Sequence, residues 1–227
     1  EPMLSSSLYA SVLSHDTLEQ SLSFVLANKL ADSTLLPTQL MEIFNTVLTE
    51  EEETAAGAEL REAVRADVAA FKERDPACVG YSHALLLFKG FHALESHRIQ
   101  HALWNRGQRL MALAMQSRIS AVFSMDIHPA ARLGKGILID HGTGVVIGET
   151  CVIGDSVSIL QGVTLGGTGK AVGDRHPKIE SHVLIGAHST VLGNIKVERG
   201  SMISAGSLVL KPVAAHTMVA GSPAKVV

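Results

Sequence analysis

The sequence predicts an α+β protein of two domains, an α-helical domain over residues 1–125 and a coil of parallel β-strands over residues 126–227. Two observations lead to this prediction. Every aromatic residue lies at or before Phe123, whereas most glycines come after Ile127. Apolar residues recur at helical spacing in the first part and at intervals of six residues in the second.

Helical periodicity divides the first domain into several segments. Asp16 and Glu19 have the spacing of a capping box, so we expect the first helix to begin there. Pro37 favours another helix start, and Asp75 ends a third helix because the residue before Pro76 is driven out of the helical conformation. The expected helices cover residues 16–30, 37–47, 54–74, 82–105 and 108–123. Their apolar faces can pack on one another or on another subunit.

Aliphatic residues at intervals of six mark the second domain. Neither an α-helix nor an alternating strand has this period, but a coil of short flat faces does, with one hexapeptide for each face and its turn. The longest columns are Ile127, Leu133, Ile139, Val145, Cys151, Val157, Val163 and, after an interruption, Ile185, Val191, Val197, Ile203, Val209. We expect the interruption, residues 166–177, to form a loop that projects from the coil and carries function. The pattern resembles the hexapeptide-repeat family of left-handed parallel β-helices, and only this resemblance implies the left hand.

The composition argues against several classes of protein. A net charge of −3 gives no electrostatic reason to bind nucleic acid or an anionic membrane, and no apolar run approaches the roughly 20 residues of a spanning helix. Cys78 and Cys151 form neither a metal-binding pair nor a disulfide framework, so we expect a reducing, cytoplasmic setting. We see no secretory signal, but the chain begins at Glu1 without methionine, which leaves an organelle leader open.

The glycine-rich stretch Asp140–Gly144 contains a candidate base for acyl transfer. Transfer from a thioester to an alcohol requires removal of the hydroxyl proton, and histidine suits this because its pKa lies near neutrality. His141 is the candidate, although an isolated histidine at a solvent-facing corner is the plainer interpretation. Asp126, about two and a half coils earlier, is the candidate partner that would fix the imidazole tautomer, with a cap at the helix-to-coil junction as the alternative.

The expected loop contains candidates for binding anionic groups. Arg175 and His176 could grip a carboxylate, since a guanidinium fork matches its geometry, while solvated loop charges are the alternative. His176, His182 and His188 are six residues apart and could bind zinc, but corner histidines explain the spacing more simply and we expect no metal. The stretch 166–170 is a weak phosphate-loop signal that could contact CoA through backbone amides.

Several motifs strongly resemble those of the serine acetyltransferases, and the resemblance covers nearly the whole chain. The matching segments are 27–30, 74–77, 89–94, 126–131, 138–144, 146–150, 163–170 and 173–179. The resemblance implies that acetyl-CoA is the co-substrate and that its acetyl group is moved to the hydroxyl of L-serine, a step of L-cysteine biosynthesis. The implied roles are base and partner for His141 and Asp126, carboxylate binding for Arg175 and His176, ammonium binding for Asp75 and Asp140, a place near the site for Glu149, and CoA binding beside Gly167, Ala187, Ala205 and Lys225. For Asp75 this replaces the local interpretation as a helix terminator alone.

The resemblance also implies partners. Members of the family form trimers through the β-helix, with active sites between subunits, and pair through their helical domains into hexamers. They resemble one another in inhibition by L-cysteine at the serine site, and many carry a C-terminal tail ending in isoleucine that binds O-acetylserine sulfhydrylase. This sequence stops at Lys225-Val226-Val227, so we expect that the tail is absent or was removed, which puts this partner in doubt.

Three other functions compete with this hypothesis. The nearest is a hexapeptide acetyltransferase acting on a sugar or another amine or alcohol, but generic relatives lack both the helical domain and the Asp174-Arg175-His176-Pro177 motif. A γ-type carbonic anhydrase is also a left-handed β-helix and would hold zinc on histidines. The third is a scaffold whose helical half binds a partner enzyme.

Overall fold

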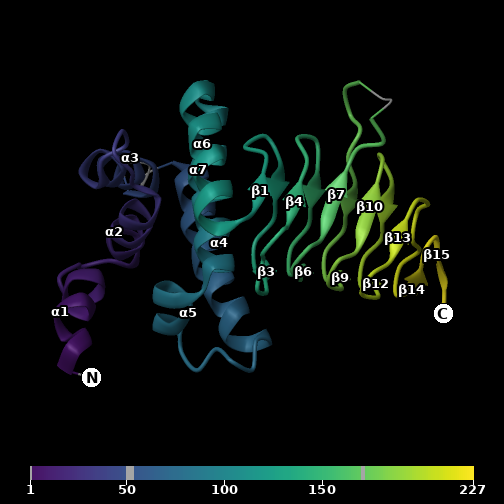
Figure 1. Cartoon of the computed structure of the whole chain (residues 1–227), viewed down its shortest axis with the longest axis horizontal. Helices are drawn as coiled ribbons and strands as arrows, with labels where there is room; N and C mark the ends of the chain where they lie inside the picture. The colour runs from purple at the N-terminus through teal and green to yellow at the C-terminus, as the bar shows by residue number, and fades with distance from the viewer. Residues whose placement is uncertain (1, 50–53, 170–171) are drawn as a thin grey trace.

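The computed structural model describes residues 2–49, 54–169 and 172–227, in which a bundle of helices leads into a coil of parallel strands (Figure 1). Two residues of the expected loop, Lys170 and Ala171, lie outside the described residues. The helical part comprises η1 (Pro2–Leu4), α1 (Ser5–Leu8), η2 (Tyr9–Leu13), α2 (Leu18–Leu30), α3 (Pro37–Thr49), α4 (Ala55–Arg74), α5 (Tyr81–Leu87), α6 (Lys89–Asn105) and α7 (Arg109–Phe123). None of the described helices is long and apolar enough to cross a membrane.

The start of α2 differs by one residue from the predicted capping box. Its cap is Thr17, whose hydroxyl accepts a hydrogen bond from the Gln20 amide, and not Asp16 with Glu19. The Gln20 side chain in turn accepts from the amide of Asp16, the residue before the cap, so the arrangement resembles a capping box shifted by one residue. The predicted starts of α3 and α4 and the predicted end of α4 are confirmed.

The single helix predicted over residues 82–105 is wrong, because the structure contains two helices there. Phe88 has an extended backbone, with φ −87° and ψ 108°, and separates α5 from α6. The start of α6 then lies on the coil, where Gly90 meets the backbone of Ile139. A Cβ atom at Gly90 would come within 1.9 Å of the Ile139 carbonyl oxygen, so this approach requires glycine. The spacing of apolar residues along the sequence does not reveal such a break between two helices.

The coil consists of three sheets, and each turn of the chain adds one short strand to each of them. The first sheet holds β1 (Asp126–Ile127), β4 (Val146–Ile147), β7 (Thr164–Gly166), β10 (Thr190–Leu192) and β13 (Leu208–Val209). The second holds β2 (Arg132–Leu133), β5 (Val152–Ile153), β8 (Lys178–Ile179) and β11 (Lys196–Val197). The third holds β3 (Leu138–Ile139), β6 (Ser158–Ile159), β9 (Leu184–Ile185), β12 (Met202–Ile203), β14 (Met218–Gly221) and β15 (Ala224–Val226), of which only the last pairs antiparallel.

The register gives the length of one turn. Val146 pairs with Thr164 and Thr190 pairs with Leu208, so each of these turns comprises three hexapeptides, one for each sheet, whereas the first turn, from Asp126 to Val146, is two residues longer. Between β7 and β10 the pairing continues from Thr164 to Thr190 although the chain between β7 and β8 projects from the coil (Figure 1). The projecting segment therefore leaves the sheet in register.

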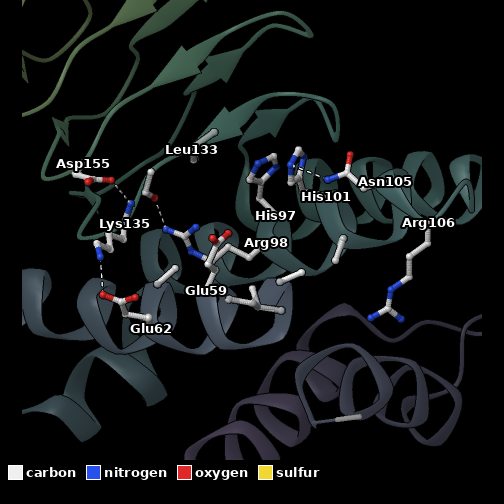
Figure 2. Close-up of a pocket in the computed structure, with 15 residues that line it drawn as sticks. Glu59, Glu62, His97, Arg98, His101, Asn105, Arg106, Leu133, Lys135 and Asp155 are labelled. Carbon is white, nitrogen blue, oxygen red and sulfur yellow. Dashed lines mark hydrogen bonds and ion pairs between the residues drawn. The ribbon is translucent and has the colours of Figure 1, made fainter. Parts of the chain in front are cut away.

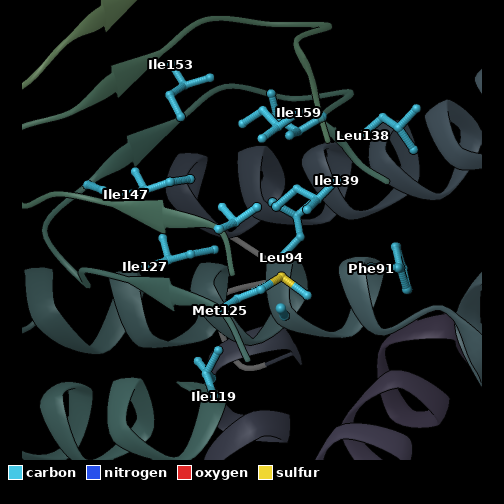
Figure 3. Close-up of a cluster of buried hydrophobic side chains, with 14 of the residues drawn as sticks. Phe91, Leu94, Ile119, Met125, Ile127, Leu138, Ile139, Ile147, Ile153 and Ile159 are labelled. Atoms are coloured by element: carbon cyan, nitrogen blue, oxygen red, sulfur yellow. The ribbon is translucent and has the colours of Figure 1, made fainter. Parts of the chain in front are cut away.

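The six-residue columns lie inside the coil, and the apolar core continues into the helices. Ile127 and Ile139 are fully buried, and they share one cluster with Phe91 and Leu94 of α6 and Ile119 of α7 (Figure 3). The end of a stack of repeats exposes apolar surface unless something covers it. Helices α6 and α7 cover this end of the coil (Figure 1).

A buried charged cluster accompanies this apolar junction. The Arg98 guanidinium of α6 lies 2.5 Å from the Asp67 carboxylate of α4 and donates to the Gly134 carbonyl of the coil at 2.7 Å. Asp67 also accepts the Ile137 amide at 2.7 Å. Burial, with the neighbouring Asp67 carboxylate, raises the pKa of Glu95 well above its usual value, which favours the protonated form. The cluster links both helices to the coil.

Candidate functional site

The turn after β3 carries the candidate base at a corner of the coil. The Asp140 amide donates to the Ile159 carbonyl at 2.9 Å, which extends the pairing of β3 with β6 up to this turn. The His141 side chain is 69% exposed, and its Nε2 lies 3.6 Å from an Asp140 carboxylate oxygen. The candidate base is therefore held on a corner of the coil with its imidazole exposed.

The backbone of His141 by itself is no sign of function. His141 has a left-handed backbone with φ +57°, which for many residues would indicate strain at a site. Ser156, His182, His188 and His216 have the same conformation at other corners of the coil. A left-handed backbone at the corners is thus a property of this fold. The alternative interpretation of these histidines, as ordinary corner residues, explains their backbone conformation.

Asp126 lies near the turn that carries His141, but its side chain makes its hydrogen bond with another residue. It opens β1, is exposed, and accepts a hydrogen bond from the Gln116 side chain at 2.6 Å. The Gly144 amide donates to the Ser124 carbonyl at 2.7 Å, so the turn and the start of β1 are neighbours. The predicted separation of two and a half coils is wrong, because Asp126 pairs with Val146 one turn later and His141 comes before Val146. Within the described ranges no hydrogen bond or ion pair joins the two side chains, so their pairing stays a prediction.

The end of α4 lies against the same pair of strands. Asp75 caps this end, and its carboxylate accepts the Ala77 amide at 2.8 Å. The preceding residue, Arg74, donates to the Ser158 hydroxyl of β6 at 2.9 Å. Since Ser158 is paired with Leu138, close before Asp140 in the chain, the structure places Asp75 and Asp140 on the same side of the coil.

A second group of predicted residues gathers at the corner that follows the first sheet. Arg175 and Glu149 form an ion pair at 2.7 Å, and the hydrogen bond from Arg175 lowers the pKa of Glu149. Nδ1 of His176 lies 2.9 Å from the Thr150 hydroxyl and 3.2 Å from its amide. The His176 ring is packed so closely on Gly148 that a Cβ there would overlap it. Burial lowers the pKa of His176, which favours the neutral ring.

His128 belongs to this second group, although the sequence suggested no role for it. Burial lowers its pKa, against the smaller opposing effects of Glu149 and Asp126. Asp126 pairs with Val146, so His128 lies level with Gly148 and next to Glu149. The pairing of β1 with β4 is the feature that connects His128 with Glu149, so the register of these two strands would have been needed to predict that they lie close together.

The nearby thiol takes no part in the chemistry of this corner. Cys151 follows Thr150, but its side chain is buried and lies 3.5 Å from the Leu165 carbonyl. Burial raises the pKa of the Cys151 thiol to about 12, so almost none of it is thiolate near neutral pH. An acyl-cysteine intermediate is therefore disfavoured here.

The residues expected to contact CoA are separated along the coil. Ala187 and Ala205 stack on each other at one corner, where the Gly206 amide donates to the Ala187 carbonyl at 2.8 Å. Gly167 follows β7 at the opposite edge of the first sheet, and Lys225 lies on β15 near the end of the coil. Among the described residues no hydrogen bond or ion pair joins this corner to Gly167 or Lys225, so the common role of the four residues stays a prediction.

A cavity of about 640 Å³ lies elsewhere, between α4, α6 and the start of the coil (Figure 2). Three of its charged groups already have protein partners: Lys135 pairs with Glu62 at 2.5 Å, and Arg98 donates to the Gly134 carbonyl. Of the described residues that line it, none was predicted for the site. We therefore place the candidate site at the coil corners. The described part of the chain also contains no group of three or more His, Cys, Asp or Glu residues able to hold a metal ion.

Comparison with known proteins gives a consistent assignment. The family model "Serine acetyltransferase, N-terminal" matches residues 1–96. Serine acetyltransferase 4 of Arabidopsis thaliana is 62% identical over all 227 residues, which span 62% of its own length. A soybean serine acetyltransferase complexed with serine is 56% identical with a TM-score of 0.95, covering 100% of this chain and 91% of that chain. A Brucella abortus serine acetyltransferase in complex with coenzyme A is 46% identical with a TM-score of 0.96, covering 100% and 88%.

These likenesses confirm the predicted fold, a helical domain followed by a left-handed parallel β-helix of hexapeptide repeats. The resemblance rests on nearly all of the chain rather than on the repeats alone. The chain belongs to the serine acetyltransferase family.

Proposed function

We propose that this chain catalyses transfer of the acetyl group of acetyl-CoA to the side-chain hydroxyl of L-serine, giving O-acetylserine and CoA. The observation that carries the proposal is the exposed histidine on the Asp140–Gly144 corner, within a chain that matches the soybean protein complexed with serine over its whole length. The Brucella abortus protein in complex with coenzyme A supports the second substrate. The two cysteines offer no alternative nucleophile, because both are buried.

In the proposed reaction His141 acts as general base. Its imidazole takes the proton from the serine hydroxyl as the oxygen attacks the thioester carbonyl, and the tetrahedral intermediate then collapses with loss of the CoA thiolate. The imidazolium returns the proton to this thiolate, so the base is regenerated in each cycle. A carboxylate next to the imidazole would stabilise the imidazolium, and Asp140 and Asp126 are the nearby candidates.

Serine would be held by its two charged groups. Arg175 and His176 would take the carboxylate, while Asp75 and Asp140 would take the ammonium group. The ion pair between Glu149 and Arg175 supports this role for Arg175, because it holds the guanidinium in one orientation. CoA would lie along the coil beside Gly167, Ala187, Ala205 and Lys225.

The division of these residues into two corners supports a site shared between subunits. Asp140 and the proposed base lie at the turn that leads into the first sheet, with Asp75 at the end of α4, and the carboxylate-binding pair lies at the turn that leads out of this sheet. We propose a trimer in which each site combines the first group of one subunit with the second group of its neighbour. We also propose that the trimers pair into hexamers through their helical domains and that L-cysteine inhibits the enzyme. A longer chain would in addition bind O-acetylserine sulfhydrylase.

Release of CoA thiol from acetyl-CoA, measured with and without L-serine, tests the reaction. Serine-dependent release that L-cysteine suppresses is the expected result. Release with a sugar or another amine, but not with serine, would keep the fold and replace the substrate. Serine-independent hydrolysis alone would contradict the proposal.

A mixing experiment tests the shared site. Chains with His141→Ala and chains with Arg175→Ala are each expected to be nearly inactive, but co-assembled chains should regain activity. Random assembly of equal amounts leaves both groups intact at about one quarter of the interfaces. Each variant assembled with itself is the control, and a mixture no more active than those controls would place the whole site within one subunit.

A further inference from the structure

Arg74, the last residue of α4, reaches out of the helical domain and binds the coil at three points. Nη1 donates to the Ser156 carbonyl at 3.0 Å and to the Ser158 hydroxyl at 2.9 Å, and Nη2 donates to the Gly136 carbonyl. A planar guanidinium can satisfy several acceptors in fixed directions, which a lysine ammonium on a flexible stem does less well. The end of α4 is therefore held in one position relative to the coil.

The three acceptors lie in, or just before, the two strands that lead to the candidate base. Gly136 lies just before β3, and Ser158 lies in β6, the partner of β3. The pair of strands continues to Asp140, whose amide donates to the Ile159 carbonyl, and the next residue is His141. Whatever fixes the end of α4 on these two strands also fixes its distance from that turn.

Asp75 follows Arg74 directly and forms a small turn of its own. One carboxylate oxygen accepts the Ala77 amide, and the Asp75 carbonyl accepts the Cys78 amide at 3.0 Å. In the part of the chain that the structure describes, the other carboxylate oxygen has no hydrogen-bond partner. Asp75 thus has an acceptor available, on a turn whose position depends on the helix end that Arg74 anchors.

We infer that Arg74 is a positioning residue for serine binding, which holds the Asp75 carboxylate at the distance from the His141 turn that the serine ammonium group requires. This inference rests on the proposed function. Arg74 itself needs no contact with substrate, so its loss should affect the binding of serine and leave the binding of acetyl-CoA unchanged. A small misplacement of a positioned group can lower a rate by about 100-fold, so an effect through Asp75 is large enough to measure.

Arg74→Lys tests the inference, with Arg118→Lys as the matched control. Arg118 is also half-buried and donates to two backbone carbonyls, of Leu30 and Ala31 at 2.9 Å each, but it joins α7 to the end of α2 and not to the coil. We expect Arg74→Lys to raise the KM for serine about tenfold, with the KM for acetyl-CoA and the Tm no different from those of the control. Equal effects of the two variants on the serine KM would overturn the inference.

A double-mutant cycle asks whether Arg74 acts through Asp75. Asp75→Asn alone should raise the serine KM, and adding Arg74→Lys to it should change the KM by less than about twofold, because the group that Arg74 positions is already impaired. Additive effects would show that Arg74 acts elsewhere and would contradict the inference.

Hydrogen exchange supplies a readout that does not depend on the reaction. The Ala77 amide, protected by the Asp75 carboxylate, should exchange about tenfold faster in Arg74→Lys than in Arg118→Lys. Unchanged protection would overturn the positioning role even if the enzyme is active. If the wild-type chain shows no serine-dependent thiol release but the exchange result holds, the proposed function fails while the anchoring of this turn stands.

Discussion

The helical domain and the coil are both well packed, but they are built from different kinds of interaction. Inside the coil the buried residues are aliphatic columns, and its buried serines bind carbonyls nearby, as Ser201 does with Glu198 at 2.6 Å. Inside the helical domain the buried set includes Asp67, His92 and Arg98. The partners of Asp67 and Arg98 lie far away in the sequence, in another helix or in the coil.

This difference determines how each region should respond to substitution. In a stack of repeats each turn contacts only its neighbours, so one substitution has a local cost that is similar from turn to turn. The cost of breaking a buried ion pair is larger, because removal of one partner leaves the other charge buried without compensation. The predictions below test this contrast, from the largest expected effect to the smallest.

His141→Ala should separate activity from stability in the coil. We expect turnover to fall by about 10²- to 10⁴-fold, the usual contribution of a positioned base, with the Tm almost unchanged because the side chain is exposed. Steady-state thiol release and thermal unfolding measure the two effects. His216→Ala is the matched control, since it has the same left-handed backbone and no proposed role. A similar loss of turnover in both variants would remove His141 as the base.

Asp67→Asn should produce the largest loss of stability. It leaves the buried Arg98 without its counter-charge, and breaking a buried pair in this way typically costs about 3–5 kcal/mol. Urea unfolding gives the value. Glu62→Gln on the same helix removes an exposed ion pair to Lys135 and should cost less than about 1 kcal/mol. Equal costs would mean that burial gives the Asp67–Arg98 pair no special role in stability.

Acid should weaken the helical domain through His92. Burial lowers the pKa of His92 to about 4, whereas its value in the unfolded chain is about 6.5. Between these values the unfolded chain binds a proton that the folded chain does not, so the stabilisation is complete above pH 6.5 and is lost as the pH falls to 4, by about 3 kcal/mol.

His92→Gln removes this titration and can still donate a hydrogen bond to the Leu85 carbonyl, which His92 Nε2 approaches at 2.8 Å. Urea unfolding of both proteins at several pH values should show a smaller loss in the variant between pH 6.5 and 4. Parallel pH profiles would contradict the assignment of the effect to His92.

Ile159→Val should cost little, about 0.5–1.5 kcal/mol, because it removes one methylene group from the buried column of the third sheet. Ile203→Val, at the equivalent place in β12, should cost the same within about 0.5 kcal/mol. Urea unfolding of the two variants compares them. A large difference would show that the turns of the coil are not equivalent.

The same contrast explains which features could be predicted from the sequence. The coil repeats a local pattern, so its buried columns and the place of the interruption were visible as a period. The charged cluster of Asp67 and Arg98 could not be predicted, because no local sequence pattern indicates which residues of two helices pair with each other. The break at Phe88 was missed for the same reason, since it depends on how α6 meets the coil at Gly90.

The candidate site was predicted residue by residue from motifs, but not its geometry. Periodicity gave the length of one face and not the number of faces in a turn, so the spacing of Asp126 and His141 was misjudged. The register that pairs Asp126 with Val146 also explains why His128 lies beside Glu149. The arrangement of the two corners in an oligomer depends on surfaces that no sequence period describes.

The projecting segment between β7 and β8 has a consequence for how such a protein can change. Thr164 and Thr190 pair in register across it, although the chain between them is longer than the chain between the paired residues Val146 and Thr164. The closure entropy of a loop grows only slowly with its length, so insertions and deletions here have a small thermodynamic cost. Arg175 and His176 are carried by this segment, while His141 is carried by the coil itself. Under the proposed function, acceptor preference can therefore evolve, or be engineered, by a change in the length of one loop, while the coil that holds the candidate base is unchanged.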